Sequence, residues 1–89
     1  MKEKHFAYKI THSSSGIVCT HSIIEEDKML DLLEEIQDQY SEGLFWIFKQ
    51  IGNQPEEQLC IIDCANKRIF YSYSGEVEKI SETIAKLHH

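Results

Sequence analysis

Apolar and polar side chains alternate with two different periods along this chain, and the two periods divide it into strands and helices. Phe6, Tyr8 and Ile10 recur at every second position within residues 5–11, which predicts a strand. A turn-forming segment at 12–16 and a short β-rich run at 17–21 follow. The two runs are therefore expected to form an antiparallel hairpin.

The next segment, residues 22–41, predicts a long amphipathic helix. Ser22-Ile23-Ile24-Glu25 fits a capping box, in which the serine hydroxyl and the glutamate three residues later each bond a free amide, so we expect the helix to begin at Ser22. The apolar positions then fall on one side of the helical wheel, centred near Leu33 and Ile36. Ser41-Glu42-Gly43 is a typical helix end.

Three β-rich runs follow the predicted helix. Residues 44–51 are apolar on both faces until Lys49, which predicts an interior strand covered on both sides. Residues 58–64 and 68–74 are joined by a short polar turn and predict a second hairpin.

A second helical stripe closes the chain at residues 76–87, where Val77, Ile80, Ile84 and Leu87 share one face. The predicted order is β-β-α-β-β-β-α within one domain, residues 1–89. This is an α+β fold with a five-stranded, mainly antiparallel sheet and two amphipathic helices.

This order of elements, from Phe6 to Leu87, resembles that of the roadblock, longin and profilin-like group of small adaptor domains. The resemblance covers the turn at 12–16, the helix at 22–41 and the closing helix. It implies a small adaptor that dimerises through a sheet edge or a helix and scaffolds a larger complex. It rests on element order and assigns no site residues.

The charge of −6 is concentrated in one segment of the chain. Eight acids and one base, Lys28, lie between Glu25 and Glu42. Like-charged neighbours three and four positions apart cost a few tenths of a kcal/mol each, so stability alone would favour mixed signs. The acids form either a solvated face or a stripe that binds a basic surface. The candidate partner-binding residues are Asp27, Asp31, Glu34, Glu35, Asp38 and Glu42.

Composition also restricts the compartment and the partners. A negative chain is not expected to bind nucleic acid or an anionic membrane directly. The first residues lack the long apolar region of a secretory signal, and no apolar run approaches the roughly 20 residues that cross a bilayer. Three cysteines without framework spacing indicate reduced thiols, so we expect a cytoplasmic protein.

Few residues have the spacing of a metal site. Cys19 and His21 are two positions apart, so their side chains would share one face of a strand. A third ligand could come only from tertiary contact, and neither a Cys-x-x-Cys nor a His-x-x-x-His pair is present. No metal or cofactor is expected; the candidate third ligands are His5, His12 and Cys60.

A thiol enzyme is a weaker alternative. His21, Cys60, Asp63 and Cys64 could supply a nucleophile and its base, but nothing in the local sequence marks an activated thiol. Cys60 and Cys64 would lie about 13 Å apart on one strand, too far for a disulfide with each other. The expected behaviour is that of small buried hydrophobic residues, and the protein is not expected to be an enzyme.

Aromatic residues are interpreted mainly as packing groups. Phe70, Tyr71 and Tyr73 follow two bases, an arrangement that can stack nucleobases, yet acids follow at once. Core and half-exposed sheet packing is the better interpretation. The aromatics of the 44–51 strand are expected in the core, although its Trp46 could anchor a partner.

The leading hypothesis is a non-catalytic interaction protein that docks its acidic helix on a basic surface of a partner protein, such as a surface that normally holds nucleic acid. Small acidic proteins of this type include phage-encoded inhibitors of bacterial defence systems and immunity proteins for toxins. The first alternative is a roadblock- or longin-like homodimeric adaptor. The second is a thiol or metal-dependent enzyme.

Overall fold

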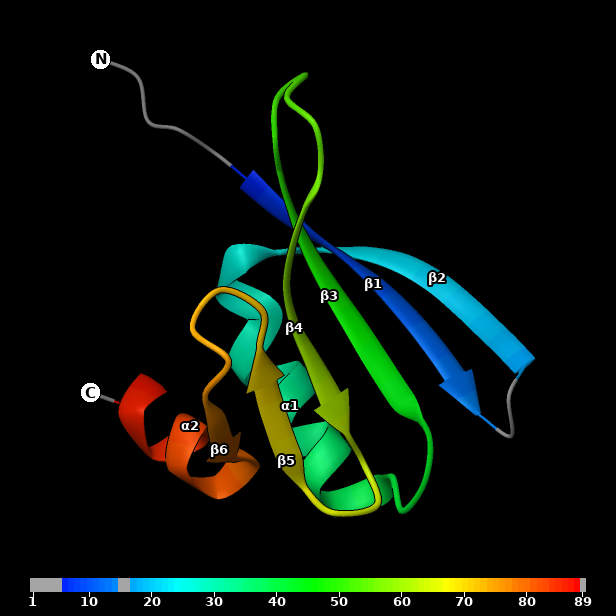
Figure 1. Ribbon diagram of the computed structural model, residues 1–89, viewed down its shortest axis with the longest axis vertical. Coiled ribbons are helices and arrows are strands. Elements are labelled where there is room, and N and C mark those ends of the chain that lie inside the picture. The colour runs from blue at the N-terminus through cyan, green and yellow to red at the C-terminus, as the bar shows by residue number, and fades with distance from the viewer. Residues whose placement is uncertain (1–5, 15–16, 89) are drawn as a thin grey trace.

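The computed structural model describes residues 6–14 and 17–88, which form one six-stranded sheet and two helices (Figure 1). The strand order is β2-β1-β3-β4-β5-β6, and every neighbouring pair is antiparallel. The elements are β1 (Phe6–Ser14), β2 (Ile17–Glu25), the 3-10 turn η1 (Glu26–Lys28), α1 (Met29–Gln39), β3 (Leu44–Ile51), β4 (Glu57–Asp63), β5 (Arg68–Tyr71), β6 (Val77–Lys79) and α2 (Ile80–Leu87).

The predicted α+β architecture is confirmed, with six strands instead of five. The additional strand, β6, occupies the start of the segment that was predicted as helix. Val77 pairs with Phe70 and Lys79 with Arg68, so tertiary pairing extends the sheet by one short strand. The carboxylate of Glu82 then accepts a hydrogen bond from the amide of Lys79 at 3.2 Å, which begins α2.

The predicted helix start at Ser22 is wrong. Ser22-Ile23-Ile24-Glu25 belongs to β2, which pairs with β1 as far as Ala7 opposite Glu25. Ile24 packs against the core and Ile23 is 69% exposed, as expected for strand alternation. The chain turns through η1, and α1 spans only Met29–Gln39.

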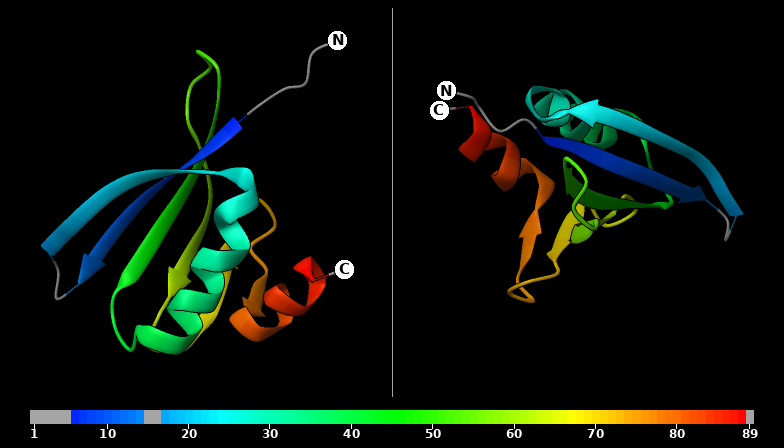
Figure 2. Two further views of the ribbon diagram at one scale, coloured as in Figure 1. Left: turned by 180° about the vertical axis from the view of Figure 1, so that it is seen from behind. Right: turned by 90° about the horizontal axis from the view of Figure 1, so that it is seen from above.

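The core lies between the sheet and the two helices, which cover the same face of the sheet (Figure 2). Ile36 from α1, Ile62 from β4 and Ile80 from α2 are each 0% exposed. Full burial of such a side chain contributes about 1.5–3 kcal/mol, so this layer supplies most of the apolar stabilisation. The buried cluster comprises Ile10, Leu33, Ile36, Phe45, Ile47, Cys60, Ile62, Cys64, Ile69 and Ile80.

Strand β3 has the bounds that the sequence predicted, but the expectation that both of its faces are covered is wrong. Phe45 and Ile47 are buried against the helices. Trp46 and Phe48 point to the other face, over which none of the described helices or strands lies (Figure 2). The fold therefore has two layers, helices and sheet, with one bare sheet surface.

The C-terminal end of α1 is held by the β4–β5 turn. Nζ of Lys67 donates to the carbonyl oxygen of Ile36 at 2.9 Å and to that of Tyr40. The amide of Cys64 donates to the carbonyl oxygen of Gly43 at 3.1 Å. The Lys67 contacts satisfy carbonyl groups at the helix end, and the Cys64 bond ties the loop after α1 to the same turn.

Candidate functional site

Four of the predicted partner-binding acids form one surface of α1, which we call the acidic face. Asp31, Glu34, Glu35 and Asp38 follow one another at three- and four-residue steps, opposite the buried Leu33 and Ile36. Asp31, Glu35 and Asp38 are exposed, and Glu34 is half-buried. The helix therefore presents these carboxylates on the side turned away from the sheet.

The other two predicted acids lie apart from the acidic face. Asp27 is in η1 and borders a shallow hollow together with Ala7 of β1 and Gln50 of β3. Glu42 follows the helix, because Tyr40 adopts an extended conformation (φ −107°, ψ 124°) that ends α1. The structure thus brings together four of the six predicted acids.

The acidic face has little local neutralisation. Among the described residues, it makes a single ion pair, between Oε2 of Glu34 and Nε2 of His88 at 3.2 Å. The last turn of α1 contains no basic residue. Lys67 approaches the helix end from the β4–β5 turn and offsets the unfavourable position of acids near that end.

A second surface lies on the bare side of the sheet. Pairing between neighbouring strands places Thr11, Trp46, Ile61, Phe70 and Val77 in one row across five strands. A second, mixed row runs parallel to it through Ile23, Lys9, Phe48 and Gln58, so Lys9 stands between the two apolar side chains. We call this surface the open sheet face; its residues are Thr11, Ile23, Trp46, Phe48, Ile61, Phe70 and Val77.

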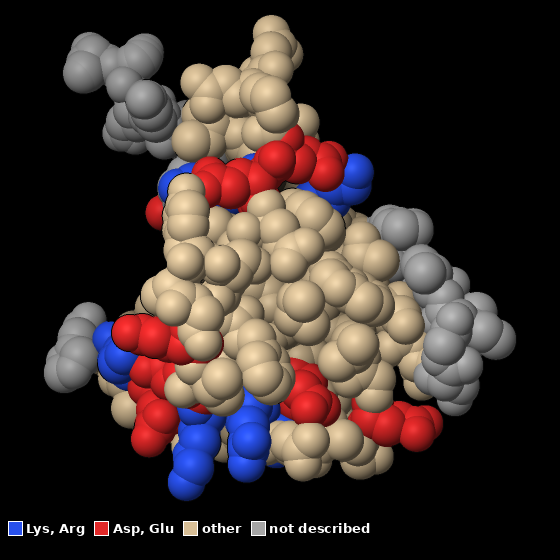
Figure 3. Space-filling model, in the orientation of Figure 1, with Lys and Arg blue, Asp and Glu red and all other residues tan. Residues whose placement is uncertain are grey.

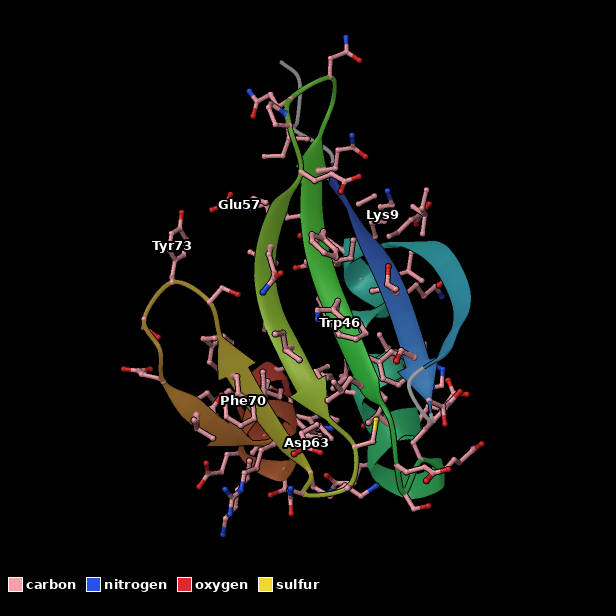
Figure 4. All side chains as sticks on the ribbon, turned by 45° about the vertical axis from the view of Figure 1, so that its right-hand side comes forward. Lys9, Trp46, Glu57, Asp63, Phe70 and Tyr73 are labelled. Carbon is pink, nitrogen blue, oxygen red and sulfur yellow. The ribbon has the colours of Figure 1, made fainter. Side chains whose placement is uncertain are left out.

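The open sheet face is mainly apolar and partly accessible, with Trp46, Phe48 and Ile61 half-buried. Phe70 is 41% and Val77 49% exposed. Trp46 stands on the central strand, on the same side of the sheet as Phe70 (Figure 4). A shallow hollow beside it is lined by Thr11, Trp46, Phe48 and Gln58. Figure 3 shows a broad uncharged field over the sheet, with charged side chains gathered along its margins.

Sequence reasoning noted that Trp46 could anchor a partner but missed the rest of this surface. It placed Trp46 and Phe48 in the core, whereas both lie on the open sheet face and outside the buried cluster. Phe70 is half-exposed as expected, while Tyr73 is 80% exposed. The available signal was the apolar character of both faces of residues 44–51, combined with only two helices to cover them.

A hydrogen-bonded cluster joins β6 to α2. Oε1 of Glu78 accepts hydrogen bonds from the hydroxyls of Thr83 at 2.6 Å and Tyr71 at 2.9 Å, and Oε2 pairs with Lys86. The Lys86 ammonium, followed by the Thr83 hydroxyl, lowers the pKa of Glu78 to about 2. Burial raises the pKa of Tyr71 to about 12. The cluster keeps one charge state around neutral pH and fastens α2 to the sheet.

Acid is expected to destabilise the fold through Glu78. Because the folded pKa of about 2 lies below the ordinary 4.5, Glu78 contributes stability above pH 4.5 that is lost as the pH falls towards 2. In Glu78→Gln this titration is absent, so the free energy of unfolding should fall less steeply over that range. Urea unfolding measures the two slopes, with Glu76→Gln as an exposed control. Equal slopes in the wild type and Glu78→Gln would contradict this assignment.

The thiols of the described residues are buried and unactivated. Burial raises the pKa of Cys60 to about 12 and that of Cys64 to about 11, so both stay protonated near neutral pH. Both are free cysteines. The carboxylate of Asp63 accepts hydrogen bonds from the amides of Ala65 (3.1 Å) and Asn66 (3.3 Å), which shape the β4–β5 turn. These three residues give the thiol-enzyme alternative no support.

The predicted metal-ligand pair, Cys19 and His21, lies in β2, but their side chains and the whole of His5 are outside the described residues. Within residues 6–14 and 17–88, leaving out the side chains of residues 17–21, no group of three or more His, Cys, Asp or Glu side chains could hold a metal ion. His12 instead stacks on Phe45 with ring centroids 4.2 Å apart. In the same ranges, no helix has the length and apolar character needed to cross a membrane.

The acidic face and the open sheet face lie on opposite sides of the molecule, with the sheet and α1 between them (Figure 2). One is strongly negative and the other is apolar. No protein family, no curated protein sequence and no solved structure matches this chain. The function must therefore be inferred from these two faces.

Proposed function

We propose that this chain is a non-catalytic protein-interaction protein that docks its acidic face on a basic surface of a partner protein, as small acidic inhibitors of the anti-defence or immunity type do. The observation that supports this proposal is the one-sided charge of α1. Asp31, Glu35 and Asp38 are exposed at neighbouring positions, and none of them has a cationic partner among the described residues.

The electrostatic consequence is selective association. Unpaired carboxylates on a rigid helix attract a basic surface over about a Debye length, roughly 8 Å at physiological salt. Such a field increases the association rate and favours basic partners more than it adds affinity. Direct binding of nucleic acid or an anionic membrane is disfavoured by the same charges.

Charge reversal tests the proposal. The partner is first captured from cells and purified, and its affinity for the wild type, Asp31→Lys/Asp38→Lys and Glu25→Lys/Glu76→Lys is then measured at increasing salt. Both double variants change the net charge equally, but only the first alters the acidic face. We expect about a tenfold or larger loss of affinity and a smaller salt dependence in the first variant, and a near wild-type result in the second. Equal behaviour of the two variants would refute the proposal.

A homodimeric adaptor is the second candidate, and the open sheet face favours dimerisation, but through a different contact from the sheet edge or helix that the roadblock and longin resemblance implies. Apolar contacts would hold such an assembly together, so reversing the acids of α1 would leave it unchanged. A thiol or metal-dependent enzyme is the third candidate; the buried, protonated Cys60 and Cys64 weigh against it.

A further inference from the structure

Strand β3 is built for burial on both sides, yet the described part of the chain covers only one of them. Trp46 and Phe48 occupy the bare side of the central strand, and Ile61 and Phe70 continue the apolar row. Isolated apolar side chains on a surface are ordinary, but a contiguous apolar row across four neighbouring strands, β3 to β6, is typical of a contact surface. The open sheet face therefore has the character of a contact surface.

We propose that a second copy of this chain covers it, through a two-fold symmetric contact between the two open sheet faces. The assembly has four layers, in the order helices, sheet, sheet, helices. In such a contact the same residues meet from both sides, so Trp46 lies near the symmetry axis in each chain. This inference is independent of the acidic face.

The size of the surface fits a stable dimer. The six strands contain 9, 9, 8, 7, 4 and 3 residues, so strands about 4.8 Å apart with about 3.3 Å per residue define a footprint of at most about 630 Å², the low end of the range for a stable interface. A standard protein interface buries about 800 Å² on each partner. Packing of two sheets face to face also buries side chains that alternate out of each strand, as these do.

The charges around the open sheet face allow contact with its own copy. One margin carries a row of neighbouring residues with both positive and negative charges: Asp63, Arg68 and Lys79. Within the second row, between Ile23 and Phe48, Nζ of Lys9 pairs with Oε2 of Glu56 at 2.7 Å, so this ammonium already has a counter-ion. A margin with both signs can be complementary to itself under two-fold symmetry.

The main negative charge of each chain is kept away from this contact. The acidic face lies behind the sheet, on the outer side of α1. With about 10 Å between packed sheets and helices about 10 Å thick, the acidic faces of two copies would lie about 30 Å or more apart. This separation is several times the Debye length of about 8 Å at physiological salt, so the repulsion is largely screened.

The sequence contains one tryptophan, Trp46, and it stands on the proposed contact. Its fluorescence therefore reports the contact directly. We expect the wild type to sediment with a mass above 10.4 kDa that rises with concentration, and its emission to shift to longer wavelength when the dimer is diluted to monomer.

A matched pair of variants locates the contact. Val77→Lys places a charge on the open sheet face, and Leu87→Lys places one on α2; the two positions are 49% and 48% exposed. Val77→Lys, alone or with Phe70→Lys, should raise the dimer dissociation constant at least a hundredfold, because a charge is buried against its own copy. Leu87→Lys should behave as the wild type. Circular dichroism and thermal unfolding confirm that each variant is folded.

Two outcomes would overturn the proposal. In the first, the wild type remains a monomer with unchanged Trp46 emission up to several hundred micromolar, and the open sheet face then belongs to a different protein. In the second, the wild type dimerises but Val77→Lys and Phe70→Lys leave the dissociation constant unchanged, and the contact then lies elsewhere, for example at the edge strand β2. The Asp31→Lys/Asp38→Lys variant tests partner binding and leaves the open sheet face unchanged, so its result does not alter the sedimentation or the Trp46 fluorescence. The docking proposal and the dimer proposal are therefore tested separately.

Discussion

Replacing Gly43 with alanine is expected to lower the free energy of unfolding by about 3 kcal/mol or more. Gly43 has φ +103°, a conformation that residues with a Cβ atom rarely adopt. A Cβ atom here would also lie 2.7 Å from the carbonyl oxygen of Ser13 and 3.1 Å from Nε2 of His12. Ser13 is held in β1 between two strands, so its backbone cannot move away cheaply.

The Gly43 prediction has a matched control within the chain. Gly52 also has positive φ, +54°, but a Cβ atom there would meet nothing within 4 Å. Gly52→Ala should therefore lower the free energy of unfolding only by the cost of a left-handed backbone conformation, about 1 kcal/mol. Thermal unfolding separates the two, since about 3 kcal/mol corresponds to a fall in Tm of roughly 12–24 °C for a domain of this size. Equal losses in the two variants would show that the contact with Ser13 is unimportant.

Replacing Lys67 with methionine is expected to cost about 2 kcal/mol, because a charged donor to the end of α1 is lost. Nζ of Lys67 bonds the carbonyl oxygens of Ile36 and Tyr40, which have lost or weakened helical partners at this end. Methionine keeps the length and apolar stem of the side chain, so the change isolates the ammonium group. Amide hydrogen exchange should increase most at Gln39 and Tyr40, in the last turn.

Two variants control the Lys67 prediction. Lys28→Met removes the same charge from the exposed η1 turn, where no helix carbonyl depends on it, and should change the free energy of unfolding by less than about 0.5 kcal/mol. Lys67→Arg keeps a cation and its donors and should retain part of the stabilisation. If Lys67→Met is as stable as Lys28→Met, the contact does not hold the helix end.

Local periodicity predicted those strands whose bounds are set by the apolar and polar residues of their own segment. The bounds of β3, residues 44–51, agree fully, because its apolar run ends at polar loop residues on the C-terminal side and at Gly43 on the other. Ser22-Ile23-Ile24-Glu25 was misassigned, since its two isoleucines fit a helix turn and a strand equally well. Pairing of β2 with β1 decided between them, and that pairing is a tertiary contact.

Tertiary contacts also explain why β6 and the contacts at the end of α1 were not predicted. Val77 and Ile80 fit one helical stripe, but Val77 pairs with Phe70 of β5 and only Ile80 begins α2. Lys67 reaches Ile36 across 31 positions, and Glu34 reaches His88 across 54. No window of local sequence contains these pairs, so neither the true end of α1 nor its neighbours could be predicted.

The acidic face was largely predictable, because charge can be counted along the chain, and four of its six expected members lie together on α1. The open sheet face was not. An apolar strand indicates that both of its faces are to be covered, but the sequence does not say on which side each helix will lie. Both α1 and α2 contribute to the same buried cluster, and this placement leaves Trp46 half-buried on the side of the sheet that neither helix covers.

The placement of both helices on one side of the sheet has a consequence for valency. In a dimer joined through the open sheet faces, the two copies of α1 would point in opposite directions, so one particle would present two equivalent acidic faces. Such a particle could bridge two copies of a basic protein, or bind a repetitive basic assembly with an avidity well above that of a single face. Chain concentration would then control cross-linking, independently of the affinity of each face.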